Sequence, residues 1–360
     1  MVNHACNLRC TYCYTGAKFH QPLPTEFALH GIRRAVQSVL PGGRIEMGFF
    51  GGEPLMEADL VWAASQTARQ EAAEQNIELV LFLTTNGMIN SPVAWQVMEH
   101  AEIQIHISHD GLPEVHDQFR TSADGRGSST QVLNTFQRLL ELGSQPRVSM
   151  VVRPDTASRL PEGIAWLREQ GIRHVDPTLD LWTTWTESDA AALEVAISRT
   201  ADLWAMGLPD CSIGWFDERV VKLAGLPVND TARCQYGDGQ VAVAPSGNLY
   251  PCERVIGEDD QENATRLPGH VMDFGPFDFQ THKNRYAGCD PCAIKQHCNT
   301  FCSCSNYIRT GDIDRPDGLL CLLDRVCHRE TARILQEMQT NVVYLKTEKK
   351  GDALWSPQTH

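Results

Sequence analysis

Three cysteines near the start of the chain have a spacing suited to an iron–sulfur cluster. Cys6, Cys10 and Cys13 are separated by three and then two residues, so their thiolates can bind three irons of one [4Fe–4S] cube. The fourth iron then has no protein ligand and is open to a small molecule that accepts an electron. A zinc loop is the alternative, but zinc sites usually close a tetrahedron, and the nearby candidates for a fourth ligand are His4 and His20.

A second group of cysteines lies far downstream. Seven of the 13 cysteines of the chain stand there at regular intervals. They are Cys234, Cys252, Cys289, Cys292, Cys298, Cys302 and Cys321. Such spacing indicates metal sites or disulfides. A disulfide framework is disfavoured because no signal peptide is recognisable and the first cysteine loop needs a reducing compartment.

The first cysteine loop resembles the signature of radical S-adenosylmethionine (SAM) enzymes. In these enzymes the amino and carboxylate groups of SAM bind the open iron, and cleavage of the sulfonium yields a 5′-deoxyadenosyl radical. The downstream cysteines resemble the SPASM extension of peptide-modifying members, which carries two auxiliary [4Fe–4S] clusters. The resemblance therefore implies SAM and three [4Fe–4S] clusters as cofactors, with Cys6, Cys10 and Cys13 on the SAM-binding cluster.

The resemblance also implies how the two auxiliary clusters share the downstream cysteines. The nearer cluster is expected to use Cys234, Cys252 and Cys302. The farther cluster is expected to use Cys289, Cys292, Cys298 and Cys321. Cys327 is an alternative to Cys321.

The nearer cluster then lacks a fourth cysteine. Cys304 or Cys211 is a candidate for this position, and a position open to substrate or water is the other alternative. A spare buried thiol remains the simplest interpretation of Cys211, Cys304 and Cys327.

The residues expected to seat SAM follow predicted strands. The run Gly51-Gly52-Glu53-Pro54 resembles the family's turn that holds the methionyl amino group, since glycines allow close backbone approach and a carboxylate complements an ammonium. Tyr12 matches the aromatic residue that shields the cluster and contacts the adenine. The segment 108–120 resembles one shared by sulfatase-maturating and peptide-modifying members, which implies that Ser108 and Arg120 contact SAM.

From residue 44 to about residue 204 the sequence alternates predicted strands and helices. Strands are expected at 45–50, 77–83, 103–108, 147–152 and 173–179, and helices at 57–75, 92–100, 129–142, 158–170 and 187–206. Repeated units with buried strands predict an α/β fold with a parallel sheet, whose chemistry lies at the carboxyl ends of the strands. The resemblance implies a partial (β/α)6 TIM barrel whose first strand is incomplete, because almost nothing precedes Cys6.

The predicted domains follow from these patterns. Residues 1–207 form the radical SAM partial barrel, 208–233 a bridging segment, 234–345 the cysteine-rich SPASM domain and 346–360 a polar tail. Residues 240–250 read as a hairpin around a Ser-Gly-Asn turn. The acidic run 258–262 reads as a solvated loop, with contact to a leader peptide as the alternative. Trp182 and Trp185 are expected either to wall a substrate entrance or to pack in the core.

The charge and hydropathy of the chain exclude two classes of partner. Lys and Arg number 31 against 45 Asp and Glu, which gives a net charge of −14, whereas a nucleic-acid partner requires a basic face. No apolar run reaches the length of a membrane span. The sequence therefore predicts a soluble, cytoplasmic protein, and its 42% hydrophobic content allows more than one domain.

The resemblance implies a radical SAM oxidoreductase that acts on peptides. The main hypothesis is a maturase that abstracts hydrogen from a residue of a ribosomally made peptide, leading to a cross-link or an oxidation. The alternative is an anaerobic sulfatase-maturating enzyme that forms formylglycine from Cys or Ser. That group has an aspartate base after the hairpin cysteine, where this chain has Glu253. A non-catalytic Fe–S or electron-transfer protein is the third class.

Glu253 is the candidate catalytic base, and pairing with Arg254 or another cation is the alternative for its side chain. The expected partners are a peptide or protein substrate and a reductant such as flavodoxin or ferredoxin. No winged peptide-binding module is recognisable, so another surface or a separate protein is expected to recognise a precursor.

Overall fold

Six parallel strands form the central sheet of the protein. The computed structural model describes residues 1–88, 91–99, 102–224, 236–237, 239–260, 263–279, 288–298 and 302–351, with side chains described as far as residue 339. The strands neighbour one another in chain order. They are β1 (Arg44–Phe49), β2 (Glu78–Thr85), β3 (Ile103–Ser108), β4 (Arg147–Val152), β5 (His174–Leu179) and β6 (Ser212–Ile213). This architecture confirms the predicted α/β fold with a parallel sheet.

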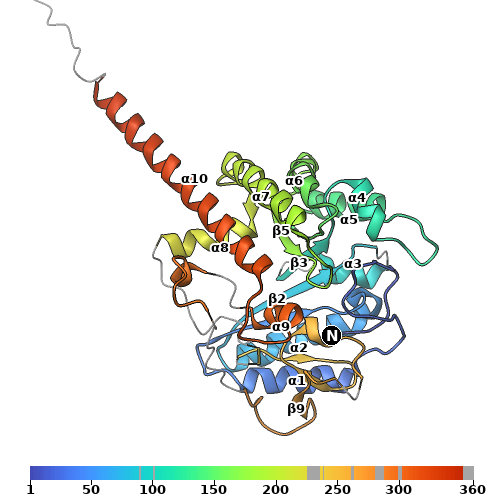
Figure 1. The fold of residues 1–360 in the computed structure, drawn as a ribbon. Coiled ribbons are helices and arrows are strands. Elements are labelled where there is room, and N and C mark those ends of the chain that lie inside the picture. Colours follow the sequence, from blue (N-terminus) through green and yellow to red (C-terminus); the bar gives the residue numbers. More distant parts are fainter. Residues whose placement is uncertain are drawn as a thin grey trace, which may run out of the picture.

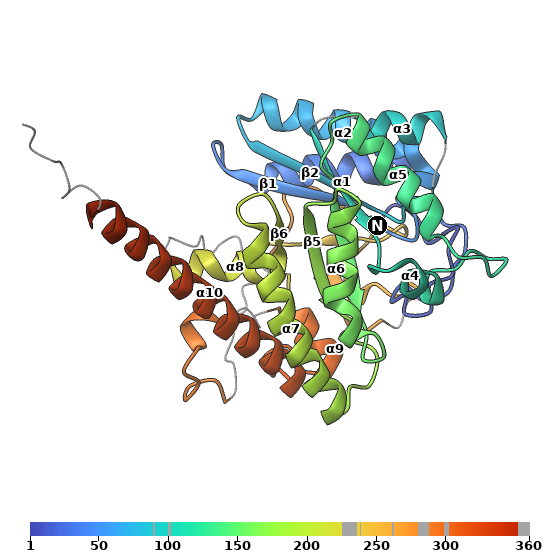
Figure 2. The same cartoon turned by 90° about the horizontal axis from the view of Figure 1, so that it is seen from above.

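Helices connect successive strands and cover the sheet (Figures 1 and 2). They are α1 (Thr25–Gln37), α2 (Ala58–Glu74), α3 (Pro92–Met98), α4 (Pro113–Phe119), α5 (Ser129–Glu141), α6 (Leu160–Glu169), α7 (Glu187–Gly207) and α8 (Gly214–Leu223). Strand residues such as Leu83 and Ile107 pack against helix residues such as Phe136 and Leu167, and all four are fully buried. Burying these apolar faces is the main force that holds the barrel together.

The residues before the cysteine loop run beside the end of β1. The N–H of Val2 donates to the carbonyl of Phe50 at 2.7 Å, and the N–H of Gly52 donates to the carbonyl of Asn3 at 2.7 Å. A Cβ on Gly52 would lie 2.1 Å from the carbonyl oxygen of Ala5, so glycine is required here for the two segments to approach. This short extended segment occupies the place where the sequence predicts an incomplete first strand.

The C-terminal part contains a small antiparallel sheet and two further helices. Its strands β7 (Ala242–Val243) and β8 (Asn248–Tyr250) form the predicted hairpin, and β9 (Leu267–His270) pairs with β8. Gly247 in the turn has φ +88°, a conformation that favours glycine. Helix α9 (Ser303–Thr310) follows the cysteine-rich segment, and α10 (Gly318–Gly351) ends the described chain.

Helix α10 packs along α7 and then leaves the body of the protein (Figure 1). Ion pairs join the two helices: Arg329 contacts Glu194 at 2.8 Å and Arg333 contacts Asp202 at 2.6 Å. Within the described residues, no helix combines the length and the apolar character needed to cross a membrane.

Two predicted boundaries differ from the structure. The predicted bridge 208–233 contains β6 and α8, which belong to the barrel. A strand of two residues leaves no periodic pattern, so the sequence does not reveal it. The second difference is α10, which begins at Gly318 and continues to Gly351 inside the predicted polar tail. Lys and Glu are good helix formers, so a polar composition does not end a helix.

Candidate active site

The cysteine loop lies across the carboxyl ends of the barrel strands. Its backbone is held by the segment that follows α4: Arg9 N–H donates to the carbonyl of Thr121 at 2.6 Å, and Thr11 N–H donates to that of Phe119 at 3.0 Å. Within the loop, Cys13 N–H donates to the carbonyl of Cys10 at 3.2 Å. These bonds fix the loop at the sheet edge where a parallel α/β fold places its chemistry.

Polar groups from the end of β2 and from the residues that follow Cys13 surround the loop thiols. The amide of Asn86, just after β2, donates to Asn7 Oδ1 at 2.7 Å and lies 3.6 Å from Cys6 Sγ. Burial raises the pKa of Cys6 to about 11. Burial opposes ionisation of Cys13 too, but Lys18 Nζ at 3.0 Å and the Thr15 hydroxyl outweigh it and lower the pKa of that thiol.

The donor set of this loop fits an iron–sulfur cluster. Three partly buried thiols are presented from one short turn, and Lys18 beside Cys13 offsets the negative charge of thiolate ligands. Among the described residues no group of three His, Cys, Asp or Glu is arranged to hold a single metal ion. A cluster differs from a single ion in this respect, because each thiolate binds a separate iron.

Glu53 differs from its expected role. Its carboxylate was expected to face the SAM ammonium, but the side chain is fully buried. It accepts hydrogen bonds from Asn86 N–H at 2.7 Å, Thr85 Oγ1 at 2.8 Å and Leu55 N–H at 2.9 Å. Burial raises the pKa of Glu53 to about 7. In this conformation the carboxylate ties the end of β1 to the end of β2 and leaves no oxygen open to a ligand.

Tyr12 and Arg120 meet on one buried carboxylate. The Tyr12 hydroxyl donates to Asp110 Oδ2, and Arg120 binds both carboxylate oxygens of Asp110 at 2.9 and 3.1 Å. The backbone N–H of Val151, in β4, donates to the same carboxylate at 3.1 Å. Arg120 is 6% exposed, so its guanidinium is mainly engaged inside the protein, and Asp110 joins the cysteine loop to β3, β4 and the end of α4.

Ser108 is the last residue of β3 and lies at the same strand edge. The next residue, His109, is fully buried and stacks on His116 with ring centroids 4.1 Å apart and on Trp166 at 5.6 Å. Burial lowers the pKa of His109 to about 4. A neutral imidazole here packs among aromatic rings.

Two charged residues at this edge were not singled out from the sequence. Arg153, directly after β4, lies over the rings of Phe119 and Tyr12 at 4.7 and 5.9 Å. It also contacts Asp180, directly after β5, at 2.6 Å. The signal that could have found them is their position, since charged residues that immediately follow buried parallel strands lie at the functional edge.

An aromatic pair lies beside the cysteine loop, at the edge where the strands end. Tyr14 of the cysteine loop stacks on Trp182 with ring centroids 5.3 Å apart, and Trp182 is 48% exposed. Arg309 of α9 donates to the carbonyls of Leu181 and Thr183 at 3.1 and 2.9 Å, so the C-terminal part holds this segment. The expectation that Trp182 lines an entrance fits this placement, whereas Trp185 packs against the core.

Three downstream cysteines are close together. Cys304 Sγ lies 3.3 Å from Cys252 Sγ and 3.2 Å from Cys302 Sγ. Glu253 Oε2 lies 3.5 Å from Cys252 Sγ, and Gln240 donates to it at 3.5 Å. Arg254 donates to Ser305 Oγ at 3.5 Å and forms no ion pair with Glu253. Cys234 lies outside the described residues.

Two of the other downstream cysteines, Cys289 and Cys292, lie near Cys321 at the start of α10. Cys292 N–H donates to the carbonyl of Cys289 at 3.0 Å. Burial raises the pKa of Cys321, and the proximity of Cys289 and Cys292 raises it further. The carbonyl of Cys298 accepts from Lys222 at 2.7 Å. Cys327, in contrast, is fully buried in the core of the barrel.

The acidic loop 258–262 has a structural role where it is described. Glu258 accepts from the N–H of Ala17 at 2.9 Å, which links it to the cysteine loop. Asp259 accepts from Asn248 Nδ2 at 3.0 Å and from the Tyr250 hydroxyl at 2.9 Å. The expected solvated loop is therefore anchored at these two positions.

Comparison with known proteins agrees with this site. Residues 2–167 match the radical SAM superfamily. The chain is 23% identical over 269 residues to a cysteine-type anaerobic sulfatase-maturating enzyme of Clostridium novyi, which covers 70% of this chain and 71% of that enzyme. It is also 23% identical to a serine-type anaerobic sulfatase-maturating enzyme of Klebsiella aerogenes, over 84% of this chain and 78% of that enzyme.

The fold is shared with two solved structures of peptide complexes. Native anSMEcpe with bound AdoMet and Kp18Cys peptide matches 94% of this chain and 97% of its own, with a TM-score of 0.74 and 16% identity. SuiB of Streptococcus suis bound to the precursor peptide SuiA matches 88% of this chain and 74% of its own, with a TM-score of 0.59 and 14% identity. The chain therefore carries a radical SAM domain and is homologous to anaerobic sulfatase-maturating enzymes.

Proposed function

We propose that this protein is a radical SAM oxidoreductase that modifies a residue of a peptide or protein. The observation that carries this proposal is the placement of three partly buried thiols, Cys6, Cys10 and Cys13, on a loop fixed across the strand ends of an α/β barrel. When bound, the cluster and SAM supply a 5′-deoxyadenosyl radical that abstracts hydrogen from the substrate.

The residues of the chain hold and orient these cofactors. Cys6, Cys10 and Cys13 bind the SAM cluster. The turn Gly51-Gly52-Glu53-Pro54 and Ser108 border the SAM site, because they lie at the ends of β1 and β3 beside the loop. Tyr12 and Arg120 act through Asp110, which fixes their geometry.

The proposal includes two auxiliary clusters in the C-terminal part. Their proposed ligands are Cys234, Cys252 and Cys302 for the nearer cluster and Cys289, Cys292, Cys298 and Cys321 for the farther one. The proximity of Cys252 to Cys302 through Cys304, and of Cys321 to Cys289 and Cys292, supports this division. The core position of Cys327 favours Cys321 as the ligand from α10.

The substrate is proposed to be a peptide side chain, and two kinds of reaction product are considered. One is a cross-link or an oxidation in a ribosomally made peptide, in line with the fold shared with SuiB. The other is formylglycine formation, which the length of the match to sulfatase-maturating enzymes favours. Glu253 beside Cys252 keeps the carboxylate of that group, with one additional methylene.

We further propose that the protein works with a reductant of the flavodoxin or ferredoxin type in a reducing, cytoplasmic environment. A precursor peptide would be recognised by a surface of this chain or by a separate protein. The stacked pair Tyr14 and Trp182 at the rim gives an extended peptide an aromatic contact.

The base role of Glu253 is tested with Glu253→Gln, and Glu114→Gln, at an exposed position of α4, serves as control. A positioned proton acceptor contributes about 10²–10⁴-fold, so we expect Glu253→Gln to retain its iron and cleave SAM but to lose product by a factor in this range. Anaerobic turnover of cysteine- and serine-containing peptides, read by mass spectrometry, gives both product and rate.

The same spectra separate the two outcomes. A cysteine that loses sulfur and becomes an aldehyde identifies formylglycine formation. In a cysteine-containing peptide, loss of two hydrogens with retention of sulfur identifies a cross-link. In a serine-containing peptide both outcomes lose two hydrogens, so formylglycine is identified there by its aldehyde. Product at the wild-type rate in Glu253→Gln, with clusters intact, would show that another residue is the base.

A further inference from the structure

The sulfur atoms of Cys252, Cys302 and Cys304 form one buried group. Cys304 is central to it, since its sulfur lies 3.3 Å from that of Cys252 and 3.2 Å from that of Cys302. These distances exceed the roughly 2.05 Å of a disulfide bond, so the three residues are free thiols. Cys252 and Cys304 are 3% and 2% exposed. Cys304 therefore lies beside two of the expected cluster ligands and is not an isolated buried thiol.

Two local elements hold this group. Cys252 directly precedes the short turn Glu253–Val255, while Cys302 is the N-cap of α9 and Cys304 lies in its first turn. The amino end of a helix favours negative charge and lowers the cost of forming a thiolate. Cys302 and Cys304 are thus presented together at the amino end of α9, beside Cys252.

A cation also accompanies the three sulfurs. Arg254 is partly buried, and its strongest electrostatic partners are Cys304, Cys302 and Glu253. A charge removed from water is stable when an opposite charge is paired with it. The Glu253 carboxylate supplies part of that charge, and cluster-bound thiolates would supply more.

Cys211 and Cys327 are not placed to join this group. Cys211 directly precedes β6, at the amino edge of the parallel sheet, and its N–H donates to the carbonyl of Gly207. Cys327 packs in the core of the barrel, with Arg219 and Asp324 among its electrostatic partners. Of the three cysteines that the sequence leaves unassigned, the structure brings Cys304 to the other ligands.

We propose that Cys304 is a ligand of the nearer auxiliary cluster, bound together with Cys252 and Cys302. This inference rests on the proposed function, because it requires that an auxiliary cluster is bound there. Cys304 then takes the position that the cysteines expected from the sequence leave open. With Cys304 as an additional protein thiolate, a cluster with four protein ligands would have no position for substrate and would act in electron transfer.

The test compares Cys304→Ser and Cys304→Ala with Cys211→Ser in the full-length protein, reconstituted anaerobically. Iron and sulfide per chain, zinc content and the EPR spectrum of the reduced protein are measured, with SAM cleavage as the sign of an intact barrel. We expect both Cys304 variants to lose up to one third of the iron, which is about four of twelve. Their EPR signal from the nearer cluster should decrease while SAM cleavage continues, and Cys211→Ser should match the wild type.

Iron content and an EPR spectrum equal to wild type in both Cys304 variants would overturn the assignment of Cys304. A wild-type protein that binds iron only through Cys6, Cys10 and Cys13, or that holds zinc in the C-terminal part, would instead overturn the auxiliary cluster itself. Cys304→Ala adds no polar group to the buried site. If both variants lose iron while SAM cleavage is retained, the loss of iron therefore reports the missing ligand.

Discussion

Asp110 shows how a single buried side chain organises this site. It accepts hydrogen bonds from Tyr12, Arg120 and the backbone of Val151, so one carboxylate links the cysteine loop, the end of α4 and β4. A buried carboxylate with a bidentate arginine is strongly oriented. The aromatic ring of Tyr12 is therefore fixed beside the cysteines before any ligand binds.

Glu53 is expected to act on SAM through the backbone turn that it supports. Glu53→Ala leaves the N–H groups of Leu55 and Asn86 and the Thr85 hydroxyl without their acceptor, at a cost of about 1–3 kcal/mol for a buried unsatisfied group. We expect the free energy of unfolding and SAM affinity to fall together, the latter by roughly ten- to a hundredfold, and Glu53→Gln to retain more of both. Urea denaturation and equilibrium dialysis measure the two quantities. A loss of affinity at unchanged stability would instead indicate direct contact with SAM.

His109 is expected to make the protein sensitive to acid. Burial lowers its pKa to about 4 in the folded state, against an ordinary value of 6.5. Below about pH 6.5 His109 is therefore protonated in the unfolded chain but stays neutral in the folded chain. The free energy of unfolding consequently decreases as the pH falls toward about 4. We expect His109→Leu to reduce the loss of stability between about pH 7.5 and pH 5.5 by about 1 kcal/mol.

Denaturation at the two pH values measures this difference, with the exposed His20→Leu as control. An equal pH dependence in His109→Leu and the wild type would show that the imidazole takes up a proton in the folded state.

At the scale of elements, the strands were the best predicted part of the fold. The bounds of β3 and β4 match the prediction residue for residue, because buried apolar residues alternate along each strand. Helix α4 was not predicted as a helix, since its seven residues are too few to show a helical period. Helix α1 was also missed, although its apolar face packs on α2.

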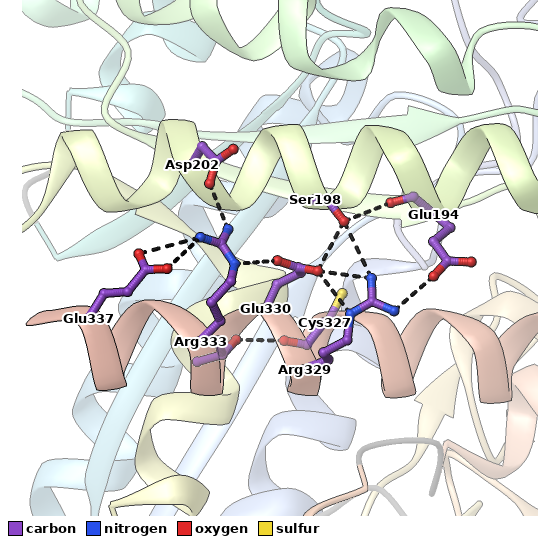
Figure 3. A network of polar contacts seen from close by, with 9 residues as sticks. Glu194, Ser198, Asp202, Cys327, Arg329, Glu330, Arg333 and Glu337 are labelled. Atoms are coloured by element: carbon purple, nitrogen blue, oxygen red, sulfur yellow. Dashed lines mark hydrogen bonds and ion pairs between the residues drawn. The ribbon is translucent and has the colours of Figure 1, made fainter.

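Helix α10 is fixed to α7 by a network centred on Glu330 (Figure 3). The Glu330 carboxylate, 5% exposed, accepts from Arg329 at 2.9 Å, Arg333 at 2.8 Å and Ser198 at 3.0 Å. We expect Glu330→Ala to lower the free energy of unfolding by about 1–2 kcal/mol, because Ser198 and two partly exposed arginines lose their charged acceptor. The exposed Glu337→Ala, which removes a pair within α10, should change it by less than about 1 kcal/mol.

Thermal or urea unfolding measures both variants. Iron content should be followed as well, since Cys321 lies near the start of the same helix. Equal stabilities of Glu330→Ala and Glu337→Ala would show that this network does not hold α10.

At the scale of the whole molecule, the barrel and the C-terminal part meet around the cysteine loop. Glu258 bonds to Ala17, and Arg309 bonds to the segment after β5. An extended peptide bound at this rim would lie between the SAM loop and the sulfur group at α9. The SAM-binding cluster and the nearer auxiliary cluster would then act on one substrate.

The cysteine loop and its place at the strand ends were predictable from sequence, because spacing and strand order determine them. The contacts that each side chain makes were not predictable from sequence. Glu53 was expected to face a ligand, but its burial is visible only when β1 and β2 are placed side by side. Likewise, Cys304 joins Cys252 across 52 residues of chain, and no local pattern predicts such a contact.

The most direct test of radical SAM chemistry is SAM cleavage by the triple variant Cys6→Ala, Cys10→Ala and Cys13→Ala. The wild type, reconstituted anaerobically and reduced, is expected to hold about twelve irons and to form 5′-deoxyadenosine. The triple variant should retain about two thirds of that iron and form no 5′-deoxyadenosine above the level of a protein-free control, measured by chromatography and mass spectrometry. An unchanged yield of 5′-deoxyadenosine in the triple variant would contradict the assignment of the site and of the function.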